Sequence, residues 1–290
     1  MAEFRKDGSE KVIYSFGSIP VYVNMGELSQ YPGYREVAHW HSEVELIAVF
    51  SGSMDFSVNG AVVTLNAGCG IFVNSKQVHY GFSPQCSDCR FICALIEPNV
   101  LCSYIGGAEK YISSLVNGGA RQYLVFNKEQ NGGGALFSAI EGLYSSKGGA
   151  GGELEALACS FHILYELYIS CGADPVGSGA DDYNLQALRR MIAFICSNYG
   201  DKIQLNDIAR AGSICKSKCN GIFKQYLNTT PVNYLIDYRI QKAMELLSCT
   251  DMKITDVCFE TGFLSVSYFI ETFKRSYGYP PSHVRKAGLS

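Results

Sequence analysis

Three histidines and one glutamate in the first third of the chain have the types and spacing of a binding site. His39 and His41 are two residues apart, so on a β-strand both side chains point to one face and Trp40 to the other. Glu45 lies on that same face if the strand is regular, and His79 is expected on a facing strand. Neutral imidazoles together with a carboxylate suit divalent zinc, manganese, iron or nickel.

The residues around this group resemble the first motif of the cupin family, in the pattern Gly33-x5-His39-x-His41-x3-Glu45-x6-Gly52. The second cupin motif keeps Gly68 and His79. It departs from the family pattern at three positions, which here are Asn74, Lys76 and Ser83. The resemblance implies a barrel in which His39, His41, Glu45 and His79 bind an effector or a metal ion.

Three interpretations of this site remain open. The first is a divalent transition metal ion, the second a small organic effector such as a sugar, and the third a set of buried histidines that only satisfy hydrogen bonds. The incomplete second motif favours the organic effector. A metal-dependent cupin enzyme or a metal sensor that uses the same four residues is the alternative function. Because no further acid–base set stands out, we expect that the protein is not an enzyme.

Short β-type segments, rich in Val, Ile and Phe, follow one another from Val12 to about Leu95. They cover residues 21–23, 44–50, 54–58, 61–65, 70–73 and 90–96. Asn59-Gly60 stands between two of them and is a strong hairpin signal. Several short strands at close spacing predict an antiparallel barrel or sandwich.

The middle of the chain, from about residue 100 to residue 179, has glycine-rich loops and helical segments. The clearest helical pattern runs from Glu153 to Ser170. Its apolar residues recur every three or four positions, at Leu154, Leu157, Ala158, Phe161, Leu164, Tyr165 and Tyr168. Such a stripe packs on the barrel or pairs with its copy in a second subunit, and we expect a homodimer.

Beyond residue 181 the apolar residues follow a helical period. Helices are expected at residues 185–196, 207–211, 216–226 and 232–247. Asn206 and Asp207 are good capping residues for the second of these helices. Pro231 suits the first turn of the fourth.

The same arrangement occurs twice in this region. Phe223-Lys224 lies 14 residues after Ala209, and Phe273-Lys274 lies 15 residues after Cys258. Each pair is followed by a turn and then by a proline. A short helix, a turn and a second helix within about 20 residues are typical of a helix-turn-helix unit, so two units are expected.

The second copy resembles the signature of the AraC/XylS family of transcription regulators. The residues that carry this resemblance are Gly262-Phe263, Ser267-Tyr268-Phe269, Phe273-Lys274, Gly278, Pro281 and Arg285. The first copy resembles the first half of the family's domain through Leu205, Ile208-Ala209, Phe223-Lys224, Pro231, Tyr234, Arg239, Ala243 and Leu246-Leu247. The resemblance covers roughly 110 residues, a size usual for one domain.

The resemblance implies that exposed residues of the two second helices read the DNA bases. These residues are Lys216, Ser217, Asn220 and Gly221 in the first unit and Ser265, Val266, Ser267, Ile270 and Glu271 in the second. Phosphate contacts are expected from Lys218, Lys224, Lys274 and Arg275. Core packing is expected for Ile208, Phe223, Phe263, Tyr268, Phe269 and Phe273. Members of the family often carry Arg at the positions of Gly221 and Glu271, so a different site preference is expected.

Charge and composition agree with this division. Residues 1–180 hold 10 basic and 17 acidic residues, whereas residues 181–290 hold 14 basic and 10 acidic ones, which makes the second part the nucleic-acid candidate. No apolar run approaches the roughly 20 residues of a membrane span, and no secretory signal is seen. We therefore expect a cytoplasmic protein whose 12 cysteines are reduced thiols. Only Cys86 and Cys89 have a spacing typical of metal ligands.

The predicted fold is α+β: an N-terminal antiparallel cupin-like β-barrel, then helices, then an all-α domain with two helix-turn-helix units. The predicted parts are an effector-binding domain at 1–100, a helical dimerisation and connecting region at 101–172, a linker at 173–182 and the DNA-binding domain at 183–290. The predicted function is that of a ligand-responsive regulator, an activator, with promoter DNA, a small-molecule effector and RNA polymerase as partners and no contact with membranes.

Overall fold

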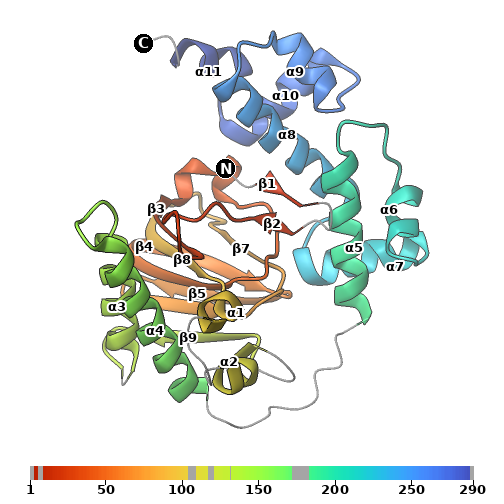
Figure 1. Cartoon of the computed structure of the whole chain (residues 1–290). Coiled ribbons are helices and arrows are strands. Elements are labelled where there is room, and N and C mark those ends of the chain that lie inside the picture. The colour runs from red at the N-terminus through yellow and green to blue at the C-terminus, as the bar shows by residue number, and fades with distance from the viewer. Residues whose placement is uncertain are drawn as a thin grey trace.

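The computed structural model describes residues 3–5, 9–103, 109–116, 121–130, 132–171 and 183–287. The strands lie in the first half of the chain and the second half is helical, which confirms the α+β class (Figure 1). The linker predicted at 173–182 lies outside the described residues. No helix in the described ranges is long and apolar enough to cross a membrane.

The first half contains nine strands, two short 3-10 helices and four α-helices among the described residues. The strands are β1 (Glu3–Phe4), β2 (Glu10–Lys11), β3 (Val21–Glu27), β4 (Val44–Val58), β5 (Ala61–Asn66), β6 (Cys69–Val73), β7 (His79–Phe82), β8 (Cys89–Ile96) and β9 (Tyr123–Asn127). The helices are η1 (Leu28–Gln30), η2 (Pro32–Tyr34), α1 (Pro98–Ser103), α2 (Glu109–Val116), α3 (Gly133–Ser145) and α4 (Gly152–Cys171).

The long strand β4 belongs to two sheets. Its first half lies in a sheet of order β3-β8-β4-β6-β9, and its second half pairs with β5 and β7. The change follows a register irregularity between Val49 and Ser51, and such irregularities bend a strand. Every pairing between these strands is antiparallel, as predicted. The bend leaves a common interior between the two sheets.

The sheet does not close into the predicted barrel, because the edge strands β3 and β9 do not pair with each other within the described ranges. Helices α3 and α4 cover one face of it instead (Figure 1). Leu46 and Ala48 of β4 share one apolar core with Phe137 and Ile140 of α3. Because the helices cover this face, its apolar side chains are shielded from water although the sheet does not close into a barrel.

The hairpin between β4 and β5 turns at the expected Asn59-Gly60. Both residues have positive φ, 49° and 88°, as the tight hairpin turn requires. Gly60 also lies against the backbone of helix α7, where an added Cβ would stand 2.6 Å from the carbonyl oxygen of Gln225. Glycine is thus required both by the turn and by a contact with the second half of the chain.

Helix α4 buries only part of the predicted stripe. Of the stripe's residues only Leu164 is buried, whereas Leu154 and Tyr165 are 73% and 58% exposed. The buried face beside α3 also contains Ile163 and Leu167, which the predicted stripe left out. The stripe is wider than the surface that α3 and the sheet offer. Its outer part therefore stays in water in this chain.

The second half contains seven α-helices in the range 183–287. They are α5 (Tyr183–Asn198), α6 (Leu205–Ala211), α7 (Lys216–Leu227), α8 (Pro231–Cys249), α9 (Ile254–Glu260), α10 (Val266–Tyr277) and α11 (Pro281–Ala287). The four predicted helices match α5 to α8 within a few residues, and Pro231 occupies the first turn of α8, as predicted. The predicted cap of α6 was wrong: Gln204 is the N-cap, and Asp207 lies three residues later in a capping box.

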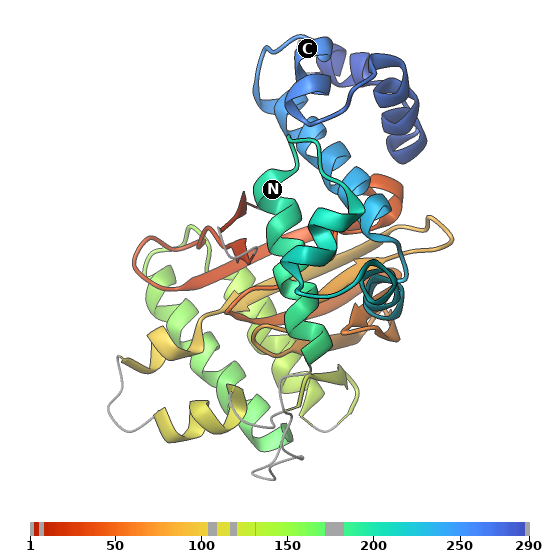
Figure 2. The same cartoon turned by 90° about the vertical axis from the view of Figure 1, so that its right-hand side faces the viewer.

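The first helix-turn-helix unit packs on the front half, whereas the second lies farther out (Figures 1 and 2). Ala38, Val78 and Tyr80 share one apolar core with helices α5 to α8. Phe263, Phe269 and Phe273 form a separate core with the second half of α8 and with α9 to α11. Helix α8 therefore contributes to both cores and joins the two units.

Candidate functional site

The predicted ligands His39 and His41 precede β4, in an extended segment that is not a regular strand as expected. Two isolated bridges hold this segment to β7, one between Arg35 and Phe82 and one between His39 and His79. At the second bridge, the His39 amide donates to the His79 carbonyl at 3.1 Å, and the His79 amide donates to the His39 carbonyl at 3.0 Å. Single bridges leave the backbone between them free to turn, so strict alternation along a strand is lost.

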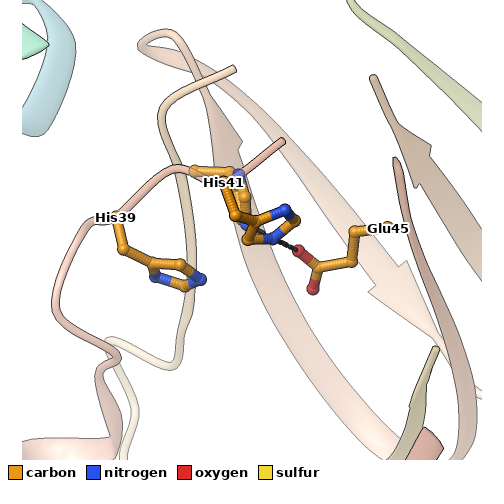
Figure 3. A group of neighbouring side chains, drawn as sticks. His39, His41 and Glu45 are labelled. Carbon is orange, nitrogen blue, oxygen red and sulfur yellow. Dashed lines mark hydrogen bonds and ion pairs between the residues drawn. The ribbon is translucent and has the colours of Figure 1, made fainter. Parts of the chain in front are cut away.

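The structure nevertheless brings the four predicted residues together. One donor atom from each of His39, His41, Glu45 and His79 lies within 4.8 Å of the others. Oε2 of Glu45 is 2.5 Å from Nε2 of His79 and 3.2 Å from Nε2 of His41. Figure 3 shows the His39 and His41 imidazoles on one side of this group and the Glu45 carboxylate, on β4, on the other. His41, Glu45 and His79 are buried, while His39 lies at the edge.

Each imidazole is oriented by the backbone through its Nδ1 atom. The acceptors are the carbonyl oxygens of Val37, Glu43 and Gln77, which lie 2.9, 3.1 and 2.9 Å from Nδ1 of His39, His41 and His79. A carbonyl oxygen only accepts, so each Nδ1 carries a proton. In a neutral imidazole the lone pair is then on Nε2 and faces the cluster. Metal-binding histidines are held in this way by their second nitrogen.

Charges of opposite sign hold the cluster together. Burial by itself would raise the pKa of Glu45, but the His79 and His41 imidazoles beside it hold that pKa well below its usual value. The three imidazole rings lie 4.5 to 5.8 Å apart between centroids.

The sequence analysis missed three residues around this group. Oε2 of Glu10, on β2, is 3.2 Å from Nε2 of His39. The Cys93 thiol, on β8, is 3.7 Å from Oε1 of Glu45, and burial raises its pKa well above the usual value. Glu36 accepts from the Gly81 amide at 2.6 Å, and burial raises the pKa of its carboxyl. The alternation of side chains along β8 would have placed Cys93 next to Glu45 only if the pairing of β8 with β4 had been known.

The predicted DNA-reading residues gather on the exposed sides of α7 and α10. Those exposed to solvent are Lys216, Ser217, Asn220, Gly221, Ser265, Ser267, Ile270 and Glu271. Val266 is half-buried against the core of the second unit. Ser265 stands just before α10 as its N-cap, and its hydroxyl accepts from the Tyr268 amide at 3.4 Å. The hydroxyl of Ser265, one of the residues predicted to read bases, therefore caps α10 in this structure.

The four predicted phosphate-binding residues, Lys218, Lys224, Lys274 and Arg275, are exposed as well. The predicted packing residues are buried, with one exception: Tyr268 is 44% exposed. Tyr268 immediately precedes the buried Phe269, so the 100° step of the helix turns it outward. Both units thus present a polar, partly cationic helix face over an apolar core.

Hydrogen bonds also join the first unit to the segment that carries His39. The Arg35 guanidinium donates to the Leu227 carbonyl at 2.9 Å and lies 4.3 Å from the centre of the Tyr80 ring. The Tyr234 hydroxyl donates to the Ala38 carbonyl at 2.7 Å. The C-terminal end of α7 and the start of α8 are therefore anchored next to the histidine cluster.

Comparisons with known proteins agree with this architecture. Residues 208–287 match a helix-turn-helix domain family, and residues 27–95 match a cupin domain family. The uncharacterized HTH-type transcriptional regulator YdeC of Bacillus subtilis is 28% identical over 263 residues, which are 86% of this chain and 85% of that protein. The two domain matches and this relative confirm the predicted combination of a cupin front and a helix-turn-helix back.

Other similarities are partial or distant. The melibiose operon regulatory protein of Escherichia coli is 34% identical over 97 residues, which are 33% of this chain and 32% of that protein. Among solved structures, fatty-acid-bound ToxT from Vibrio cholerae covers 91% of this chain and 94% of its own, with 16% identity and a TM-score of 0.49.

Proposed function

Because this chain belongs to the AraC/XylS family of transcription regulators, we propose that a divalent transition metal ion in its front domain controls how it binds promoter DNA. The observation that carries the proposal is the orientation of the three imidazoles. Each donates from Nδ1 to a backbone carbonyl, so that Nε2 of His41 and of His79 faces Glu45, while Nε2 of His39 faces Glu10 at the edge of the cluster.

The residues present fit such an ion. Nε2 of His79 is buried and has no hydrogen-bond partner in the described part of the chain, although it lies 2.5 Å from Oε2 of Glu45. Two lone-pair atoms this close to each other are stabilised when one cation binds both. His39, His41, His79 and Glu45 would hold the ion, and a nitrogen- and oxygen-rich set of this kind suits zinc, manganese, iron or nickel. The ion would supply positive charge next to the Glu45 carboxylate.

The same geometry makes a sugar a poorer occupant of this cluster. The four donor atoms lie within 4.8 Å of one another, only slightly wider than the roughly 4.4 Å between opposite ligands of one ion with bonds of about 2.2 Å, so a small closure of the cluster would let one ion contact all four. A metal-dependent cupin enzyme is the alternative function of the same residues. The relatives named above are regulators, which supports a regulatory role.

The DNA-binding residues remain predictions of the same proposal. Lys216 and Asn220 of α7 would meet guanine and adenine edges, and Glu271 of α10 would accept from cytosine. The exposed cations Lys218, Lys224, Lys274 and Arg275 would contact phosphates. Activation through a contact with RNA polymerase and a cytoplasmic location belong to the same proposal, as does the division into parts at 1–100, 101–172, 173–182 and 183–290.

The exposed face of α4 is the surface that we assign to the homodimer. Leu154, Ala158, Tyr165 and Ile169 are exposed at helical spacing along it. Two such faces would bury apolar side chains that one chain leaves in water. A single-chain mass in light scattering at micromolar concentration would contradict the dimer.

Metal content tests the proposed function. Tag-free protein, purified without chelator and then incubated with zinc, manganese, iron or nickel and desalted, is expected to retain one equivalent of one of these metals per chain. His41→Ala is expected to lose it. His162→Ala is the matched control, because His162 lies on α4 with a side chain that is 51% exposed. Equal metal content in both variants, or none in the wild type after loading, would contradict the proposal.

A second measurement connects the ion to DNA. DNA selected in vitro by the metal-loaded protein is expected to bind the loaded and chelator-treated protein with different affinities. An affinity that chelation leaves unchanged would exclude control by the ion, although the site itself would stand.

A further inference from the structure

Large apolar side chains are exposed on the second helix of the second helix-turn-helix unit. Leu264, two residues before the start of α10, is 79% exposed, and Tyr268 and Ile270 of α10 are 44% and 37% exposed. We call these three residues the apolar face of α10. In the described range 205–227, which contains α6 and α7, no large apolar side chain is exposed. The two units therefore differ in the chemistry of the surface that each would turn toward DNA.

The core of the second unit does not require this face. It is filled by Phe263, Phe269 and Phe273, which are buried. The Tyr268 ring extends outward from that core, with its centroid 6.0 Å from that of Phe263. Because removal of apolar surface from water is favourable, the exposed side chains favour a partner that carries apolar groups.

The apolar face surrounds residues that are predicted to read bases. At about 100° per residue, Ser267 and Glu271 lie between Tyr268 and Ile270 around the helix. Leu264 stands at the N-terminal end of α10, and this is the end of a recognition helix whose residues contact base edges. A major groove that meets Ser267 and Glu271 would therefore also meet apolar side chains on both sides of them.

The contact between α10 and the front half leaves this face open. Helix α10 meets that half at η2, where a Cβ added to Gly33 would stand 3.9 Å from the carbonyl oxygen of Ser276. Ser276 follows Ser267 by nine positions, which is half a turn around the helix. Figure 1 shows the second unit, with α10, at the outer end of the molecule. The front half therefore approaches α10 from the side opposite to Ser267.

Charge favours DNA as the occupant of this face. Lys274 and Arg275 are exposed in the last turn of α10. Two cations on the same helix suit the phosphates that border a groove. Among the base edges in the major groove, thymine alone carries a methyl group, at its C5 atom. An apolar helix face between cations and base-reading residues thus matches thymine-containing DNA.

We propose that Leu264 and Ile270 read thymine by packing against its C5-methyl group, so that the second unit selects T·A pairs through apolar contact. The first unit has the polar side chains of Lys216 and Asn220 at its surface instead, and it reads bases by hydrogen bonds. The two halves of the recognition sequence are therefore distinguished by different chemistry. Thymine readout of this kind rests on the DNA binding proposed above, and it does not require the metal ion.

Deoxyuridine tests the methyl contact directly, because it pairs with adenine as thymidine does and lacks only the methyl group. DNA is selected in vitro by the full-length protein, in the metal-loaded or chelator-treated form, whichever binds more tightly. Each thymidine of the selected site is then replaced in turn. Replacement at the contacted positions is expected to weaken binding by about fourfold per methyl. Tight, selective binding that no replacement weakens overturns the proposal and leaves DNA binding intact. Failure to select any sequence contradicts both.

Variants assign the contact to residues. Leu264→Ala and Ile270→Ala are each expected to bind the thymidine site more weakly and to lose the sensitivity to deoxyuridine at one or more positions. Phe259→Ala is the matched control, since it removes an exposed apolar side chain from α9 of the same unit, and it is expected to keep that sensitivity. Wild-type sensitivity in both α10 variants, or an equal loss in Phe259→Ala, overturns the assignment.

Discussion

The two helix-turn-helix units share their local construction and differ in what surrounds them. Helices α7 and α10 both end on a left-handed residue, Asn228 and Gly278, with φ of 51° and 81°. A proline starts the helix that follows each of them. In each unit an arginine from the following helix donates to carbonyls just before the short helix, in the loop or at the end of the helix that precedes it. Arg239 binds those of Tyr199 and Asp201, and Arg285 binds those of Leu247, Thr250 and Met252.

The surroundings of the two units are different. The core of the first unit continues into the front half through Ala38, Val78 and Tyr80. The core of the second unit contains only residues of α8 to α11 and the loops between them. A repeated local sequence thus produces the same helices twice. Which of the two units packs closely on the front half depends on the surface that lies next to it. The first unit can therefore respond to events in the front half through a shared core, whereas the second meets that half at a smaller contact, where Ser276 of α10 lies beside Gly33 of η2.

The largest expected effect comes from removing one equivalent phenylalanine from each unit. Phe223 and Phe273 are both completely buried, and a Phe→Ala change in a core costs about 3–5 kcal/mol. Phe223→Ala is expected to shift the unfolding transition seen by Trp40 emission, because Trp40 packs against the same core. Phe273→Ala is expected to leave that transition in place and to change only helical circular dichroism. Equal shifts of the Trp40 signal would show that the two cores unfold as one.

The contact between Tyr234 and Ala38 tests the docking itself. Tyr234→Phe removes the hydroxyl that donates to the buried Ala38 carbonyl, and an unsatisfied buried acceptor costs about 1–3 kcal/mol. A lower denaturant midpoint in Trp40 emission is expected. Tyr277→Phe, which makes the same change beside Phe273 in the second unit, is expected to leave that midpoint unchanged. If Tyr277→Phe lowers the midpoint as much as Tyr234→Phe does, the hydrogen bond from Tyr234 to Ala38 does not specifically stabilise the packing of the first unit on the front half.

Arginine substitutions at Gly221 and Glu271, where family members often carry arginine, compare how the two units read DNA. Gly221 has open space where a Cβ would stand, and Glu271 is exposed. Gly221→Arg and Glu271→Arg are each expected to favour sites with guanine opposite the changed helix by about 1–3 kcal/mol per base pair. In vitro selection with each variant measures this preference. Selected sequences identical to those of the wild type would show that these positions do not face bases.

The smallest expected effect is on the salt dependence of DNA binding. Lys224→Gln and Lys274→Gln each remove one exposed cation from equivalent positions of α7 and α10. If both units contact phosphates, each variant lowers the slope of log affinity against log salt by about one. Fluorescence anisotropy at several salt concentrations measures the slope. A change in Lys274→Gln alone would mean that the docked unit is kept away from the DNA.

The candidate site shows which parts of such a prediction depend on long-range pairing. His39, His41 and Glu45 could be grouped from the sequence because they lie within seven positions of one another. Glu10 and Cys93 could not, because they join the group only through pairings between distant segments. The cap of α6 at Gln204 was missed for a local reason: Asn206 and Asp207 are stronger capping residues by type, and the helix begins before both.

The sequence by itself determined the two helix-turn-helix units, the turn at Asn59-Gly60 and the residue types of the histidine site. These features depend on helical spacing, turn chemistry and near neighbours, all of which are local. Only the tertiary structure decided the open sheet, the packing of the first unit on the front half, and the addition of Glu10 and Cys93 to the histidine site. These depend on how surfaces distant in the chain fit together, and a linear pattern does not specify that fit.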